Sequence, residues 1–329
     1  MTTDGTTAAA DSRAGRRVDV IALANVGRRY GVLILIVVLM IALTIRSDAF
    51  LTTRNLLNIL TQNAPLAIVA MAGTLVIVSG GFDLSTGAIF AVASTSAAWV
   101  ALHHDPVLGL VTAPLVGLGL GLTNGLVITG LRVHSFLATL ATSLVYRGLA
   151  VLITGGSLIS LTNDTTFAKL GRGKVGDVSY AIFILVAVFA LLTFLARRTV
   201  AGRHIYAVGG NVDAAVLSGV RVRRVQILAF TLSGVAAGIG GAITVSRVAT
   251  GSAQAGEGVE LQAIASIILG GTSVYGGEGA VWRSLAGVML LALINNGFNI
   301  LNANPFYKDL TTGVIIVLAV ALSVGSGRR

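Results

Sequence analysis

The sequence predicts an all-α membrane protein, a polytopic bundle of transmembrane helices with about ten spans. Hydrophobic residues make up 55% of the 329 residues and charged residues only 11%, whereas a soluble domain has roughly 25% charged residues. Apolar runs of about 20 residues or somewhat fewer, long enough to cross a bilayer, recur along the chain. The 41 glycines suit helices that approach one another closely in lipid.

The spans are expected within one membrane domain, residues 30–325. Residues 1–29 are rich in Thr, Ala and Arg and are expected to form a disordered cytoplasmic tail. No small-residue cleavage site follows the first apolar run, which ends at Arg46, so this run is expected to be a retained anchor. A short cytoplasmic tail, 326–329, ends the chain. The expected spans are 30–46, 59–79, 84–102, 107–130, 136–154, 180–197, 226–246, 260–277, 281–300 and 309–325.

The basic residues predict the orientation. When the N-terminus is placed in the cytoplasm, most arginines fall in the cytoplasmic tails and loops, as the positive-inside rule requires. Both termini are therefore expected in the cytoplasm, together with a loop at 199–225, and the polar loop 155–179 is expected outside. The same rule explains the net charge of +10 without nucleic acid as a partner.

Two pairs of phrases suggest an internal repeat. "LVIVSGGFDLS" around Gly80 is similar to "ASIILGGTSVYGG" around Gly270, and "TNGLVI" at Thr123 is similar to "NNGFNI" at Asn295. Transporter folds often contain such duplications. The spacing from the glycine pair to the asparagine differs between the two copies, so chance similarity of apolar sequence remains the alternative interpretation.

Several kinds of chemistry have no signature in this sequence. The chain has no cysteine, which excludes disulfides and thiolate metal sites. No GxSxG elbow, no helical histidine pair and no GxxxxGK[ST] phosphate loop occurs. "GRGKVG" at 171–176 matches GxGxxG but lies in the expected external loop. The sequence therefore predicts neither an enzyme nor a cofactor in this chain, and any ATP that powers it is bound by another chain.

Polar residues interrupt the apolar sequence at a few positions. In "GGFDLSTG", Asp83 lies between two spans and can cap the following helix together with Ser85, or begin a broken helix that faces a solute pathway. "LGGTSVYGGEGAVW" at 269–282 is a glycine-rich bend. The candidate residues of a translocation pathway are Asp83, Asn124, Asn295, Asn296 and Asn299. Amides within a span either bind hydroxylated solutes or join helices.

Glycines four residues apart mark two helix faces. Gly117, Gly121 and Gly125 form one run, and Gly234 and Gly238 form another. Small residues at this spacing allow close helix contacts. A static contact and a contact that moves during function are both consistent with the pattern.

The stretch "AVGGNVDAAVLSGVRVRR" at 207–224 is far more polar than its surroundings. Gly209 and Gly210 are expected to interrupt the preceding structure, Asn211 to cap a short helix and Gly219 to end it. A helix at 212–218 is too short to be stable alone in water. It must dock on the protein's own cytoplasmic surface or on a soluble partner.

These phrases together resemble one family. "AGRHIYAVGGNVDAAVLSGVRV", "GGFDLSTGAIFAVAS", "GEGVELQAIASIILGGTSVYGGEG" and "NNGFNIL" are similar to segments of the ribose-type sugar permeases of ATP-binding-cassette importers, in the same order and from about Phe50 to Leu322. Gln262, Phe82 and Arg283 depart from the family pattern, which leaves the choice of sugar open. The residues that the resemblance assigns to the ATPase-coupling segment are Arg203, Gly210, Asn211, Ala214, Ala215 and Gly219.

The resemblance implies a multi-pass permease subunit in the bacterial plasma membrane that forms a monosaccharide pathway by alternating access. Its implied partners are cytoplasmic ATPase subunits, which bind the ATP, a periplasmic or lipid-anchored sugar-binding protein, and a second copy of the permease. A permease for branched-chain amino acids or nucleosides is the nearer alternative. An ion-coupled secondary transporter that uses Asp83 or Glu260 is a more distant one.

Overall fold

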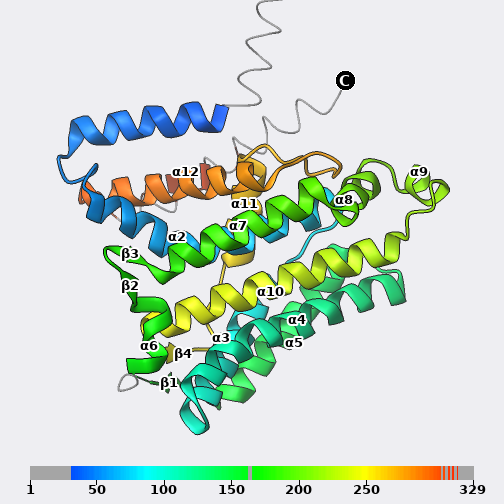
Figure 1. Cartoon of the computed structure of the whole chain (residues 1–329), viewed down its shortest axis with the longest axis horizontal. Coiled ribbons are helices and arrows are strands. Elements are labelled where there is room, and N and C mark those ends of the chain that lie inside the picture. The colour runs from blue at the N-terminus through cyan, green and yellow to red at the C-terminus, as the bar shows by residue number, and fades with distance from the viewer. Residues whose placement is uncertain are drawn as a thin grey trace, which may run out of the picture.

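A computed structural model describes residues 31–161 and 165–304, and beyond these only residues 307, 310, 311, 313, 314 and 317. The two tails expected at 1–29 and 326–329, and most of the span expected at 309–325, lie outside the described residues. The described part of the chain is almost entirely helical (Figure 1).

Seven of the described helices are long and apolar enough to cross a membrane, which makes the chain a multi-pass membrane protein, as expected. Each coincides with one of the expected spans. A shorter apolar helix, Gly31–Arg46, precedes them. The seven are α2 (Thr53–Val78), α3 (Thr86–His103), α4 (Pro106–Leu131), α5 (Ser135–Thr154), α7 (Tyr180–Arg198), α10 (Val222–Val248) and α12 (Val281–Ile300).

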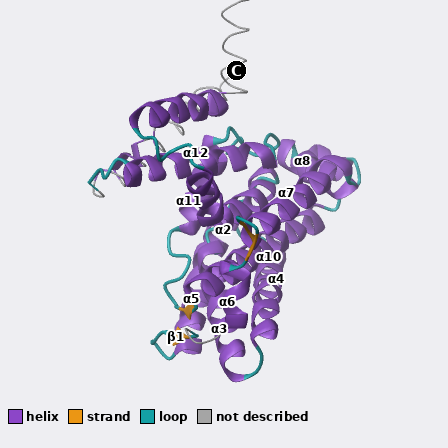
Figure 2. Cartoon of the chain, turned by 60° about the vertical axis from the view of Figure 1, so that its left-hand side comes forward, coloured by secondary structure: helices purple, strands orange, loops and turns teal. Residues whose placement is uncertain are grey.

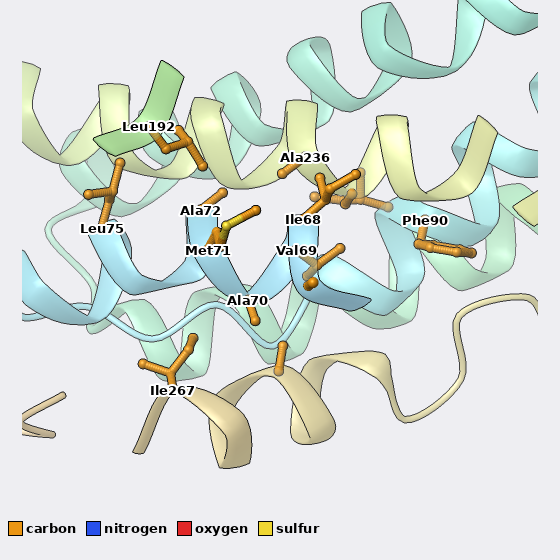
Figure 3. Packing of buried hydrophobic residues seen from close by; sticks show 14 of the residues in the cluster. Ile68, Val69, Ala70, Met71, Ala72, Leu75, Phe90, Leu192, Ala236 and Ile267 are labelled. Atoms are coloured by element: carbon orange, nitrogen blue, oxygen red, sulfur yellow. The ribbon is translucent and has the colours of Figure 1, made fainter. Parts of the chain in front are cut away.

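The core of the bundle surrounds α2. Most of α2 is buried, and its side chains Ile68, Met71 and Leu75 are fully covered. Figure 3 shows them between Leu192 of α7 on one side and Ile267 on the other. In contrast, α4, α5 and α7 leave most of their apolar surface uncovered within this chain, as expected for helices that contact lipid or another membrane subunit.

The two glycine runs predicted from the sequence face each other. α4 and α10 lie side by side (Figure 1). A Cβ atom added at Gly117 would lie 2.2 Å from the carbonyl oxygen of Gly234, and one added at Gly121 would lie 2.5 Å from that of Phe230. The helices therefore touch backbone to backbone, which explains why side chains are absent from these positions.

The span expected at 260–277 is wrong. α11 covers only Val259–Leu269, 11 residues, or about 16 Å at 1.5 Å per residue, roughly half of the hydrocarbon core. Glycines with positive φ stand on both sides of it, Gly258 before and Gly271 after, and loop 270–280 follows. Residues 260–277 are apolar enough for a span, but these glycines limit the length of the helix. α11 packs between α2 and α12 (Figure 2).

The segments expected on opposite sides of the membrane lie at opposite ends of the bundle (Figure 1). At one end, β1 (Ile159–Ser160) pairs antiparallel with β4 (Thr250–Gly251). Helix α6 (Thr165–Arg172) and the hairpin of β2 (Lys174–Val175) and β3 (Val178–Ser179) lie beside them. At the other end lie α8 (Val200–Gly210) and α9 (Val212–Leu217), which together occupy most of the loop expected at 199–225.

Candidate functional site

Helix α8 folds back against the end of α7. The Thr199 hydroxyl accepts a hydrogen bond from the Gly202 N–H at 3.1 Å and so caps α8. Gly202 allows the sharp turn, because an added Cβ would lie 2.2 Å from the Leu195 carbonyl oxygen. The helix was expected to be interrupted at Gly209 and Gly210; α8 includes both residues and ends directly after them, at Asn211. Gly209 has a different purpose, a close contact with Val78.

The short helix α9 has the caps that the sequence predicted. The Asn211 Oδ1 atom accepts a hydrogen bond from the Ala214 N–H at 2.9 Å. Asp213 lies in the first turn, where a negative charge is favourable. Gly219 follows the helix with φ +80°, a conformation that strongly favours glycine. Because both ends are capped, six residues hold a helical turn that would not persist alone.

The two faces of α9 differ. Ala215 is 4% exposed and packs against the protein's own core. Val216 and Leu217 are 56% and 89% exposed, and Ala214 is also exposed. The segments before and after α9 carry exposed arginines, which are Arg203 in α8 and Arg221, Arg223 and Arg224 around the start of α10. The helix thus presents a rigid apolar surface at one end of the bundle.

A second feature is the break between α2 and α3. α2 ends at Val78, and Gly80 turns the chain with φ +85°. The Asp83 carboxylate is buried and accepts hydrogen bonds from the Ser85 N–H at 3.0 Å and the Ser85 hydroxyl at 2.6 Å. The Ser233 hydroxyl of α10 donates to its other oxygen at 2.8 Å. Asp83 therefore organises the residues just before α3 and joins them to α10.

The hydrogen bonds continue from Ser85 into two more helices. The Asn124 amide of α4 donates to the Ser85 hydroxyl at 2.6 Å, and the Tyr146 hydroxyl of α5 donates to the Asn124 Oδ1 atom at 3.0 Å. Asn124 and Tyr146 are 1% and 4% exposed. Asp83 and Asn124 were predicted from the sequence, but Ser233 and Tyr146 were not, because a single polar residue within an apolar span does not show which helix it faces.

The first turns of α3 and α11 meet next to this network. A Cβ atom added at Gly87 would lie 1.9 Å from the Glu260 Oε2 atom. A cavity at this point is lined by apolar residues of α2 and α11 and by Asp83, Thr86 and Glu260. The Thr86 hydroxyl and the Glu260 Oε2 atom have no hydrogen-bond partner among the described residues. Within the same residues, no group of three or more histidine or acidic side chains could hold a metal ion.

The three asparagines of α12 have different surroundings. Asn296 exchanges two hydrogen bonds with Asn55 of α2, at 3.1 and 2.8 Å, so it joins two helices. The Oδ1 atom of Asn295 is buried and unpartnered among the described residues, and Asn299 is exposed. The pathway candidates therefore separate into a group around Asp83 and Asn124 and a second group on α12.

Comparison with known proteins shows the family. Residues 55–320 match the family described as the branched-chain amino acid transport system permease component. The chain belongs to this family. The ribose import permease protein RbsC of Bacillus subtilis is 38% identical over 287 residues, which cover 87% of this chain and 89% of that protein.

Two further relatives are similar over comparable lengths. The L-arabinose permease AraH of Azospirillum brasilense is 34% identical over 293 residues, covering 89% of this chain and 86% of that protein. The D-allose permease AlsC of Escherichia coli is 34% identical over 298 residues, covering 89% of this chain and 91% of that protein. No solved structure matches the chain. The relatives are permease components, as the resemblance implied.

Proposed function

We propose that this chain is the membrane permease subunit of an ATP-binding-cassette importer for a monosaccharide. It forms the sugar pathway, and separate cytoplasmic ATPase subunits bind the ATP and dock on α9. The observation that carries the docking role is the two-sided structure of α9, with Ala215 buried against the bundle and Val216 and Leu217 exposed beside it. The assignment of a monosaccharide as the solute is supported by the relatives, whose names refer to ribose, L-arabinose and D-allose.

Burial of apolar side chains supplies the affinity for the ATPase. Covering a fully exposed leucine or valine contributes about 1.5–3 kcal/mol, and Leu217 is 89% exposed. Asn211 and Gly219 fix the shape of the helix through its caps, so little ordering is required on docking. Arg203, Gly210 and Ala214 are also exposed in α8 and α9, so they are accessible to the docked ATPase.

The sugar-binding protein and the second copy of the permease contact other parts of the bundle. A sugar-binding protein docks at the opposite end, where α6 and the β2–β3 hairpin lie. A second copy of the permease covers part of the apolar surface that α4, α5 and α7 expose. The family description names branched-chain amino acids, so a permease for these solutes is the second candidate. Measuring the uptake of labelled D-ribose and of labelled L-leucine distinguishes the two candidates.

Docking is tested by charging the exposed face of α9. Val216→Glu places a carboxylate where the ATPase would cover a valine that is 56% exposed. Val175→Glu is the matched control, because Val175 is 60% exposed in the hairpin at the opposite end. The measurement is the yield of ATPase subunits that co-purify with the permease in mild detergent.

The expected result is at least a tenfold lower yield of ATPase for Val216→Glu, with permease levels in the membrane unchanged, and full yield for Val175→Glu. Equal yields for both variants would show that α9 does not bind the ATPase. Ala215 is unsuitable for this test, because it is 4% exposed and its substitution would disturb the permease itself.

A further inference from the structure

Three segments meet at the last turn of α8. They are the end of α2 at Val78, loop 270–280 and α8 itself. The Gly277 N–H of the loop donates a hydrogen bond to the Val78 carbonyl oxygen at 2.9 Å. The Tyr206 hydroxyl of α8 donates to the Gly279 carbonyl oxygen, also at 2.9 Å. We call this meeting point the α8 junction.

Glycines bring the backbones of the junction into contact. A Cβ atom added at Gly209 would lie 1.6 Å from the Val78 carbonyl oxygen and 2.6 Å from the Gly277 nitrogen. One added at Gly276 would lie 3.0 Å from the Gly209 carbonyl oxygen and 3.2 Å from the Gly80 Cα atom. At Gly209, the backbone of α8 therefore lies directly against the backbone of α2 and of the loop. Backbone in van der Waals contact transmits a movement directly, because close-packed interiors compress little.

The rest of α8 is fixed to the same body. Ile205 and Val208 are fully buried in the main core. The Tyr206 ring is half-buried, and burial raises the pKa of its hydroxyl, an effect that Arg197 and Arg283 partly oppose. The hydroxyl therefore stays protonated at neutral pH and continues to donate to Gly279. A displacement of α8 cannot occur without a displacement of Val78 or of the loop.

The junction is connected to two regions of the bundle, the break before α3 and the loop between α11 and α12. Four residues after Val78, the Phe82 N–H donates to the Ser135 hydroxyl at 3.0 Å, and the next residue is Asp83. On the other side, loop 270–280 begins at the end of α11 and leads into α12. α11 is the half-length helix that carries Glu260. One contact point thus connects α8 to the break before α3 and to the loop between α11 and α12.

We propose that Gly209 and Tyr206 are positioning residues that pass the movement of α9 to these two regions. This inference rests on the proposed docking of an ATPase at α9. When ATP draws the ATPase subunits together, α9 and α8 move as one piece, and the junction displaces the end of α2 and loop 270–280. The change in access of the membrane pathway depends mainly on the contact at Gly209 and, to a smaller extent, on the hydrogen bond from Tyr206.

The chain contains no cysteine, which allows a direct test with two introduced labels. Tyr275→Cys places a spin label on loop 270–280, where Tyr275 is 69% exposed, and Leu131→Cys places one at the end of α4, where Leu131 is 71% exposed. The distance between the labels is measured by pulsed electron paramagnetic resonance in the purified complex with the ATPase, without nucleotide and with ATP plus vanadate.

The labelled protein is compared with two variants and two controls. Gly209→Ala forces the last turn of α8 away from Val78, and Tyr206→Phe removes one hydrogen bond without changing the shape. The controls make the same substitutions elsewhere: Gly148→Ala, where an added Cβ meets nothing within 4 Å, and Tyr180→Phe at the opposite end of α7. We expect the ATP-dependent change in distance to fall by at least half in Gly209→Ala and measurably in Tyr206→Phe, and to persist in both controls.

The outcomes separate this proposal from the docking proposal. If ATPase subunits co-purify and both variants keep the full change in distance, the junction is a static anchor and the inference is wrong. If Gly209→Ala is not produced in the membrane, Tyr206→Phe decides alone. If no ATPase co-purifies with the unsubstituted chain, the docking proposal fails and takes this inference with it.

Discussion

At the scale of single residues, Asp83 is the most constrained polar group of the break before α3. It is buried and accepts three hydrogen bonds, two from Ser85 and one from Ser233. A carboxylate in such a place is stabilised only while its donors are present. The arrangement explains Asp83 as a structural acceptor that joins α10 to the start of α3, and it requires no ion-coupling role.

Substitution of Asp83 separates these roles. Asp83→Ala leaves the buried Ser85 and Ser233 donors without an acceptor, which we expect to cost about 3 kcal/mol and to lower the midpoint of thermal unfolding in detergent. Asp83→Asn keeps an acceptor for Ser85 and a polar partner for Ser233, and we expect about 1 kcal/mol and at least half of wild-type uptake. Complete loss of uptake in a well-folded Asp83→Asn variant would favour an ion-coupled transporter.

Some features of single residues can be predicted from the local sequence. Others depend on contacts between residues that are far apart in the sequence. The cap at Asn211 and the turn at Gly219 follow from residue types and spacing. Asn296 bonds to Asn55, which lies 241 positions away in the sequence, and Tyr146 of α5 bonds to Asn124 of α4. Such pairs depend on how whole helices pack, so one sequence does not specify them.

At the scale of elements, the contact between α4 and α10 depends on glycine. The glycines spaced four residues apart in α4 and in α10 were visible in the sequence. The contact between these two helices could not be predicted, because apolar helices in this chain have many glycine-rich faces. In the structure, Gly117 and Gly234 place each carbonyl oxygen 2.2 Å from the other's missing Cβ. This spacing leaves no room for a methyl group on either helix.

The contact predicts a contrast within one helix. Gly117→Ala must push α4 away from α10, and overpacking of this kind costs about 1–3 kcal/mol. Gly119→Ala, two residues away, meets nothing within 4 Å and gains helix propensity. Thermal unfolding in detergent should therefore show a lower midpoint for Gly117→Ala and an unchanged or higher midpoint for Gly119→Ala. Equal midpoints would mean that α4 and α10 do not touch as described.

The length of α11 shows where element prediction failed. Residues 260–277 contain enough apolar sequence for a span, yet the helix stops at Leu269. Gly271, Gly276 and Gly277 all take positive φ beyond that point. A composition window averages such residues, whereas the backbone responds to each of them, so broken helices are systematically read as complete spans.

At the scale of the whole molecule, the two ends of the bundle have different characters. One end carries the exposed apolar surface of α9 and exposed arginines, and the other carries α6 and the short strand pairs. The positive-inside rule predicted that loops 199–225 and 155–179 lie on opposite sides of the membrane, and the described residues of these loops lie at opposite ends of the bundle. In the function that we propose, other chains drive this membrane subunit from one end and supply it with solute from the other.

Reconstituted transport is the decisive test of the proposed function. The permease is placed in proteoliposomes with its ATPase subunits and its binding protein, and uptake of labelled D-ribose, L-arabinose, D-allose and L-leucine is measured with and without ATP. We expect one of the three sugars to accumulate only when both ATP and the ATPase subunits are present. Collapse of the proton and sodium gradients should have no effect. Accumulation by the permease alone under an ion gradient, or of leucine in place of every sugar, would contradict the proposed function.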